Sequence, residues 1–359
     1  MEQRRVSGIK IAMVYIGTVV GAGFATGQEI LQFFVRFGIG GLWGILLSTV
    51  LFALYGVLIM RLGMALSARS HLEVIQGIGG AGFGVLIDAL IMLSLFGAVT
   101  AMLAGSGALF AQQFGVPAAL GSAVMAVLTA VTVMRGLHGV INAISAVVPF
   151  LLVSVIGISV YALMNAPPDL QGVPVSGGGL MGNWLWAAIL YSSYNILMSA
   201  SILAPLGGAV SDRRQVFRGG ALGGIGLGAA SLLIYLALSA SSAETRGLAV
   251  PLLHIAGRIG PLAGALFSAV LLAEIYTTAV GSLYGFSARL AGQGGTRGGA
   301  SPTGMPIKII VATVLAFLAS LLGFTNLVRT LYPLQGYGGI VFLLAILYAT
   351  LRQTRSAPK

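Results

Sequence analysis

Long apolar stretches separated by short polar segments form the dominant pattern along the chain. The hydrocarbon core of a bilayer is about 30 Å thick, and a helix needs about 20 apolar residues to cross it. Runs of this length lack the alternation that a lipid-facing β-strand requires. The pattern therefore predicts an all-α integral membrane protein with ten transmembrane helices, over residues 10–36, 39–61, 82–113, 117–134, 140–164, 183–209, 216–239, 259–289, 306–323 and 327–350.

Composition supports this interpretation. Of the 359 residues, 57% are hydrophobic and only 8% are charged, whereas soluble proteins carry roughly a quarter charged residues. Length alone would suggest several soluble domains, but lipid as the solvent predicts a single transmembrane domain over residues 1–359. The chain has no cysteine, which excludes disulfides and thiolate chemistry.

The net charge of +11 reflects topology. With the N-terminus placed in the cytoplasm, 15 of the 19 Lys and Arg residues fall on the inner side, and Arg36, Arg246, Arg258 and Arg329 fall outside. The positive-inside rule then predicts a multi-pass protein of the cell membrane with both termini cytoplasmic. A nucleic-acid partner would need these charges on one face of a soluble domain, so none is predicted.

A Pro- and Gly-rich outer loop, residues 166–182, divides the chain into two halves of five spans each. The halves cover residues 1–165 and 183–351. Because five is odd, the second half enters the membrane from the opposite side, as in an inverted repeat. The halves show no evident residue-level similarity, so this prediction depends on the span count.

The first span carries a glycine-rich segment followed by an acid. Gly21, Ala22 and Gly23 permit either close helix packing or a break in the helix that turns backbone groups toward a cavity. Gln28 and Glu29 follow directly, and an acid inside a membrane is a functional hypothesis by default. We therefore expect a break, with Glu29 facing a substrate amine or titrating, and with free carbonyls from Val19 to Ala22 holding a cation.

The run VYIGTVVGAGFATGQEILQFF, residues 14–34, resembles the first span of the YkvI-type membrane protein family. That family is a branch of the amino acid-polyamine-organocation superfamily, which shares the LeuT fold, and the resemblance extends over most of the chain. It implies a five-plus-five inverted repeat with broken first and sixth helices and a substrate bound midway between them.

The sixth span places a polar cluster in mid-membrane: Tyr191, Ser192, Ser193, Tyr194 and Asn195. One interpretation has the hydroxyls bonded to carbonyls one turn earlier and the tyrosines packed between helices. The other has these groups contacting substrate beside a helix break. No glycine marks that break, which departs from many LeuT-fold relatives.

The eighth span carries Glu274, Thr277 and Thr278 on one helix face, an oxygen set that suits a hard cation such as sodium. The resemblance implies the same site, since sodium-coupled LeuT-fold transporters have a small residue followed three and four positions later by Ser or Thr. Glu274 departs from that small residue, so it either adds charge to a sodium site or carries a proton. A protonated Glu274 bonded to a neighbouring helix is the structural alternative. For Asp88 we expect an ion pair with an inner Arg.

These features predict a cation-coupled symporter that moves a small amino acid or related amine-bearing solute by alternating access. The coupling ion is Na⁺ or H⁺, no cofactor is expected, and the partners are the solute and the bilayer. The alternative is a ligand sensor of the same fold that transports nothing, as in spore germinant receptor membrane subunits. An enzyme is not predicted, because no nucleophile with a base, metal cluster or phosphate loop is visible.

Overall fold

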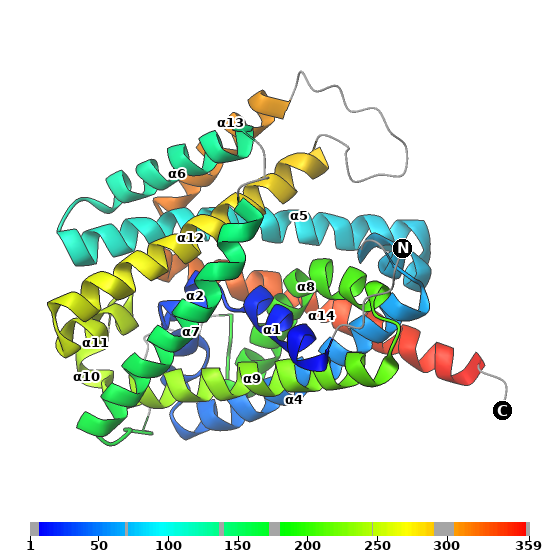
Figure 1. Ribbon diagram of the computed structural model, residues 1–359, viewed down its shortest axis with the longest axis horizontal. Coiled ribbons are helices and arrows are strands. Elements are labelled where there is room, and N and C mark those ends of the chain that lie inside the picture. Colours follow the sequence, from blue (N-terminus) through cyan, green and yellow to red (C-terminus); the bar gives the residue numbers. More distant parts are fainter. Residues whose placement is uncertain are drawn as a thin grey trace.

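The computed structural model describes residues 7–68, 71–135, 140–171, 180–245, 247–290 and 305–356. All regular elements in these ranges are helices (Figure 1). They are α1 (Gly8–Val19), α2 (Ala22–Ala25), α3 (Gln28–Phe33), η1 (Val35–Phe37), α4 (Ile39–Ala65), α5 (His71–Phe114), α6 (Ala118–Arg135), α7 (Val140–Asn165), α8 (Trp184–Ala209), α9 (Arg213–Ala240), α10 (Ser242–Thr245), α11 (Pro251–Ile259), α12 (Pro261–Leu290), α13 (Met305–Ser320) and α14 (Phe324–Ser356).

Seven helices of the described chain are long and apolar enough to cross a membrane, namely those in α4, α5, α6, α8, α9, α12 and α14. Three shorter apolar helical segments accompany them: Gly8–Val19, Pro149–Asn165 and Pro306–Ser320. The all-helical membrane architecture predicted from the apolar stretches is confirmed.

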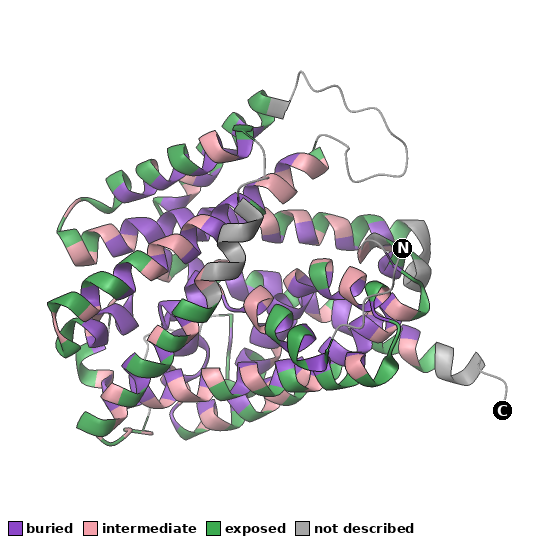
Figure 2. Ribbon diagram, in the orientation of Figure 1, coloured by how far each residue is buried: buried purple, intermediate pink, exposed green. Residues whose placement is uncertain are grey.

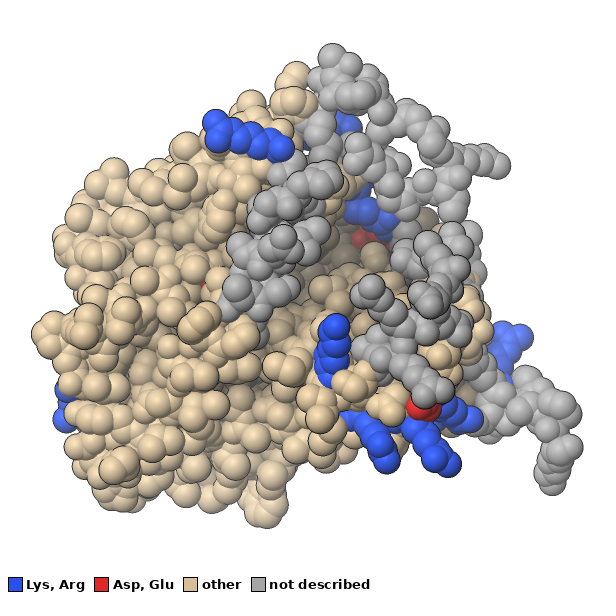
Figure 3. Space-filling model, viewed as in Figure 1, with Lys and Arg blue, Asp and Glu red and all other residues tan. Residues whose placement is uncertain are grey.

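Apolar side chains cover the outside as well as the core. Buried residues face the interior of the helix assembly (Figure 2). Large exposed side chains such as Val153, Met164 and Leu262 are 70%, 80% and 73% exposed. On the face drawn in Figure 3, most Lys and Arg side chains lie in the right half of the view. Such an apolar exterior is suited to lipid rather than water.

The predicted break in the first span is confirmed. Helix α1 begins after Ser7, whose hydroxyl accepts from the Lys10 amide, and ends at Val19. Val20 and Gly21 are extended, and α2 then starts at Ala22. A second interruption follows at Gly27, whose φ of 81° is left-handed, a conformation that glycine adopts without steric cost. The first span is therefore three short helices, α1, α2 and α3, interrupted at Val20–Gly21 and again at Gly27.

The predicted break in the sixth span is wrong. Helix α8 runs without interruption from Trp184 to Ala209. Its polar side chains bond back to carbonyls within the helix: Ser193 Oγ to Leu190, Ser199 Oγ to Ile196 and Asn195 Nδ2 to Tyr191. These groups add to a complete backbone ladder, and no glycine or proline interrupts the segment before Pro205.

Glycines bring α1, α4, α8 and α9 into close contact. A Cβ at Gly63 would overlap the Ala204 carbonyl, one at Gly207 would overlap the Met60 carbonyl, and one at Gly224 would overlap the backbone of Ala53. Small residues allow helix backbones to approach closely in membranes. These four helices, which we call the glycine-packed group, form one side of the central region.

Candidate functional site

A central cavity of about 90 Å³ lies at the break in the first span. Five other segments complete its wall, contributed by α3, α5, α8, α12 and α14. The lining residues are Gly17, Thr18, Val19, Val20, Gly21, Ala22, Gly23, Glu29, Ala98, Met102, Tyr194, Asn195, Met198, Thr278, Tyr332 and Gln335.

Glu29 is the charged side chain in this wall. It is only 5% exposed, and its Oε2 accepts a hydrogen bond of 2.5 Å from the Tyr194 hydroxyl. A Cβ at Gly23 would overlap its Oε1, so the missing side chain of Gly23 provides the space for the carboxylate. The break in the first span and α8 thus position one buried acid together.

Tyrosine rings border the carboxylate. The ring centroids of Tyr194 and Tyr332 are 5.1 Å apart. Tyr191 packs instead against Phe33, Phe34 and Phe52 at centroid distances of 5.4, 4.9 and 5.8 Å. Tyr191 also contacts Tyr194 at a centroid distance of 5.8 Å, so Tyr191 supports the site through packing although it does not line the cavity.

The structure separates the residues predicted for the site into two groups. Val19, Gly21, Ala22, Gly23, Glu29, Tyr194, Asn195 and Thr278 line the cavity, and Gln28, Tyr191, Ser192, Ser193, Glu274 and Thr277 do not. Successive residues of a continuous helix point in directions about 100° apart, so the polar run of α8 cannot face one side. Tyr194, Asn195 and Met198 are the α8 residues that share the cavity face.

Glu274, the acid of the eighth span, does not line the cavity but bonds to a threonine that does. Thr278 lines the cavity, and its Oγ1 donates to Glu274 Oε1 at 3.3 Å. Thr277 Oγ1 donates instead to the Glu274 backbone carbonyl at 3.1 Å. Glu274 Oε2 is buried and has no hydrogen-bond partner within the described residues, so this carboxylate has an unused acceptor.

Backbone carbonyls at the break differ in their availability. Those of Gly21 and Ala22 accept bonds from the Ala25 and Thr26 amides at 2.9 and 2.8 Å. The last carbonyls of α1, up to Val19, belong to a helix end, where intrahelical donors run out. Among the predicted carbonyl ligands, Val19 therefore has the freer acceptor and Ala22 the more engaged one.

Sequence reasoning missed the contribution of α14. Tyr332 and Gln335 line the cavity from this helix, and Met102 and Met198 add flexible thioethers. One signal was present: Gln335 is a polar residue inside an apolar span, the same criterion that singled out Glu29. The methionines carry no such signal, because apolar residues are ordinary within spans.

A larger cavity of about 450 Å³ lies between α5, α8 and α12, and Met198 lines both this cavity and the central one. His71 and Arg289 also line it. Arg289 forms an ion pair with Asp88, joining α12 to α5, which confirms the expected pairing of Asp88. We call this space the Arg289 cavity.

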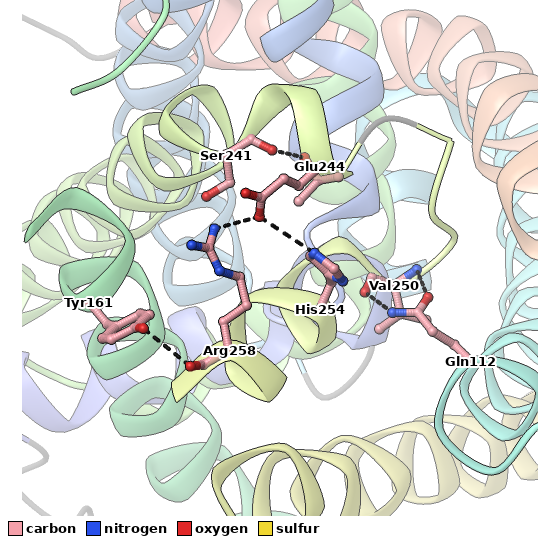
Figure 4. Close-up of polar contacts among 8 residues, drawn as sticks. Gln112, Tyr161, Ser241, Glu244, Val250, His254 and Arg258 are labelled. Carbon is pink, nitrogen blue, oxygen red and sulfur yellow. Dashed lines mark hydrogen bonds and ion pairs between the residues drawn. The ribbon is translucent and has the colours of Figure 1, made fainter. Parts of the chain in front are cut away.

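The segment that contains α10 and α11, which we call the covering segment, packs against the first span at Gly27, where a Cβ would lie 3.0 Å from Leu252. Figure 4 shows polar contacts of this segment. The Gln112 amide brackets Val250 by donating to its carbonyl at 2.9 Å and accepting from its N–H at 3.2 Å. The Leu252 N–H donates to the Thr26 carbonyl at 3.1 Å. Both Val250 and Leu252 are fully buried, so this covering segment closes over the first span.

Polar contacts tie the covering segment together. Arg258 Nη1 pairs with Glu244 Oε2 at 2.5 Å, and His254 Nε2 lies 3.6 Å from the same oxygen. The Tyr161 hydroxyl of α7 donates to the Arg258 carbonyl at 3.2 Å. These groups are shown in Figure 4.

No protein-family model matches the chain. Two full-length relatives do. The chain is 29% identical over 362 residues to the uncharacterized membrane protein YkvI of Bacillus subtilis (strain 168), covering 99% of this chain and all of that protein. It is 25% identical over 343 residues to the uncharacterized protein YyaD of the same organism, covering 95% and 96%.

Solved structures share the fold at low sequence identity. A Na⁺-coupled sialic acid symporter matches with a TM-score of 0.66 and 15% identity, over 95% of this chain and 79% of that one. The inward-facing conformation of Mhp1 gives 0.62 and 16%, over 96% and 74%. MhsT in complex with L-phenylalanine gives 0.60 and 18%, over 94% and 89%. The chain is therefore a full-length homologue of the YkvI-like membrane proteins, built on the LeuT-like fold of secondary transporters.

Proposed function

We propose that this protein is a cation-coupled symporter that moves a small amino acid or related amine-bearing solute by alternating access. The observation that carries the proposal is Glu29, a buried carboxylate in the wall of a central cavity at a helix break. A carboxylate is costly inside a membrane unless it faces protein or water, and it is a suitable partner for an amine. The structural likeness to MhsT, described in complex with L-phenylalanine, supports an amino acid as the solute.

Coupling is assigned to Glu274, Thr277 and Thr278 with carbonyls at the end of α1. Thr278 brings this set to the cavity and contacts Glu274 directly. Carboxylate, hydroxyl and carbonyl oxygens form a donor set for a hard cation, and the unused Oε2 of Glu274 is available for it. Sodium is our preferred ion, supported by the fold shared with a Na⁺-coupled symporter, and a proton on Glu274 is the alternative.

Topologically, we propose ten spans arranged as two five-helix repeats, residues 1–165 and 183–351. The seven long helices and the three shorter apolar segments together supply this number. An even number of crossings puts both ends of a chain on the same side of the membrane, and the positive-inside rule places that side in the cytoplasm. The Arg289 cavity is then the inner path and the covering segment is the outer closure.

Uptake into proteoliposomes tests the proposal. Labelled amino acids and amines are offered under an imposed sodium or proton gradient, with the wild type and three variants: Glu29→Gln, Glu274→Gln and Asp169→Asn. We expect Glu29→Gln to abolish uptake and Glu274→Gln to remove its dependence on the gradient. Asp169→Asn, which also replaces a carboxylate by an amide but at an exposed loop position, serves as the matched control and retains coupled uptake.

Two outcomes would contradict the proposal in different ways. If Glu274→Gln left sodium and pH dependence unchanged, the coupling site would be wrong. If no solute accumulated under either gradient while a solute still raised the melting temperature of the purified protein, the chain would be a membrane ligand sensor of the same fold.

A further inference from the structure

Gln335 lines the central cavity and carries a buried hydrogen-bond donor. The side chain is 4% exposed, and its Nε2 has no hydrogen-bond partner within the described part of the chain. Several other buried polar side chains also have unpartnered atoms, but among them Gln335 alone lines the central cavity. An unpaired buried donor costs about 1–3 kcal/mol, so a donor kept in this position indicates a ligand that pairs with it.

Close packing between α14 and the helices α5 and α8 fixes the position of the Gln335 amide. A Cβ at Gly97 of α5 would overlap Gln335 Nε2, so the bare backbone of α5 provides the room that the amide occupies. From the other side, α14 is held against α8, because the Ser193 hydroxyl donates to the Gly336 carbonyl at 2.7 Å. A Cβ at Gly339 would meet the Ser193 carbonyl. These contacts fix the turn of α14 that carries the amide.

The cavity therefore offers two complementary groups. Glu29 is the charged side chain in the described wall, and neither Lys, Arg nor His lines it. A cationic group on a solute pairs with Glu29, and an acceptor group on the same solute pairs with the amide of Gln335. Tyr332, one turn before Gln335 on α14, approaches Tyr194 and so connects the two ends of the wall.

We propose that Gln335 is a specificity-determining residue that binds the carboxylate end of a small zwitterionic solute whose amine is held by Glu29. This inference deepens the proposed function and depends on it, because it assigns the second end of the same site. It also separates amino acids from simple amines, since an amine without an acceptor would leave Gln335 Nε2 unpaired. The volume of the cavity favours short side chains.

Matched ligand pairs test the assignment. Alanine and ethylamine differ by the carboxylate, as do glycine and methylamine. Binding to the purified full-length protein is measured by calorimetry for the wild type, Gln335→Leu and Glu29→Gln. We expect the wild type to bind alanine more tightly than ethylamine, and Gln335→Leu to weaken alanine binding roughly tenfold or more, as expected for a lost bond to a charged group. Ethylamine binding should change less than threefold.

A second variant guards against misfolding. Gly97→Ala keeps the Gln335 side chain but displaces its amide, so we expect the same selective loss of alanine. Melting temperatures and size-exclusion profiles identify variants that fold. If Gln335→Leu fails to fold, Gly97→Ala decides the question alone.

The failures of the two proposals are distinguishable. Equal losses for alanine and ethylamine in a folded Gln335→Leu or Gly97→Ala protein, or no loss for either, would overturn the role of Gln335 alone, provided Glu29→Gln abolishes binding of both ligands. If Glu29→Gln leaves both ligands bound as before, the substrate site itself is misplaced.

Discussion

The carboxylate of Glu29 occupies the position that the Cβ of any larger residue at position 23 would need, so it packs directly against Gly23. The two residues are six positions apart, on either side of the Gly27 turn. The interruption at Gly27 between α2 and α3 allows these two residues to come into contact.

Gly23→Ala should displace the Glu29 carboxylate and destabilise the protein by about 1–3 kcal/mol, as overpacking does, with loss of amine or amino acid binding. Gly21→Ala is the matched control for stability, because a Cβ there meets nothing within 4 Å and the extended φ of −120° suits alanine. Denaturation midpoints and ligand-induced thermal shifts measure both effects. Equal destabilisation by the two substitutions would contradict the assigned contact.

Tyr194→Phe removes the hydroxyl that donates to Glu29 Oε2. We expect solute affinity to fall roughly tenfold, because the carboxylate loses a bond that orients it. Tyr337→Phe makes the same chemical change at a tyrosine whose hydroxyl bonds the Leu180 carbonyl on the exposed side of α14. Calorimetry should show little change for that control, and a matching loss in both variants would argue against a role for Tyr194 in binding.

Gln112→Leu should loosen the covering segment, because it removes both bonds to Val250. The chain contains no cysteine, so a single thiol introduced in the cavity wall by Ala98→Cys reports accessibility by itself. We expect a small thiosulfonate reagent added from the outer side to label this thiol several-fold faster in the Gln112→Leu background. Gln113→Leu, one residue along α5, should leave the rate unchanged. Equal rates in both would contradict the closure.

His71 predicts a specific pH dependence of stability. Burial and the nearby Arg289 guanidinium lower the pKa of His71 to about 4. The unfolded chain then binds a proton between pH 6.5 and pH 4 that the folded protein excludes, so stability falls as the pH drops through this window. His71→Asn should remove about 1–3 kcal/mol of that acid-induced loss.

The measurement compares denaturation midpoints of the wild type and His71→Asn from pH 8 to pH 4.5. Above about pH 7.5 the difference between them should be constant, because His71 is neutral in both folded and unfolded states. Parallel curves over the whole range would show that His71 titrates alike in both states.

The break in the first span was predictable because its cause is local. Glycines at 21, 23 and 27 and an acid at 29 form a signature within ten residues. Glu29 and Thr278 were found for a related reason, since polar groups inside a membrane are expensive and rarely incidental. The break in the first span, Glu29 and Thr278 could therefore be predicted from local sequence and from the cost of polar groups in a membrane.

The remaining features depend on packing between distant segments. The resemblance to LeuT-fold relatives implied a broken sixth span, but the local sequence of α8 lacks the glycine or proline that would interrupt its ladder. The exclusion of Ser192 and Ser193 from the cavity follows from that continuity. The Gln335 amide packs against Gly97, which is more than two hundred residues away in the sequence. Spacing along the chain does not predict such a contact.

The glycine-packed group has a mechanical consequence. Where backbones touch directly, as at Gly63 with Ala204 and Gly207 with Met60, no flexible side chains stand between α4 and α8 to absorb sliding. A displacement of α8 that widens access to Glu29 must therefore carry α4 with it, and α1 and α9 through their own close contacts. We therefore expect these four helices to move as one rigid body. A single methyl group at Gly207 would push α8 away from the Met60 carbonyl of α4 and so disturb that body at its closest internal contact.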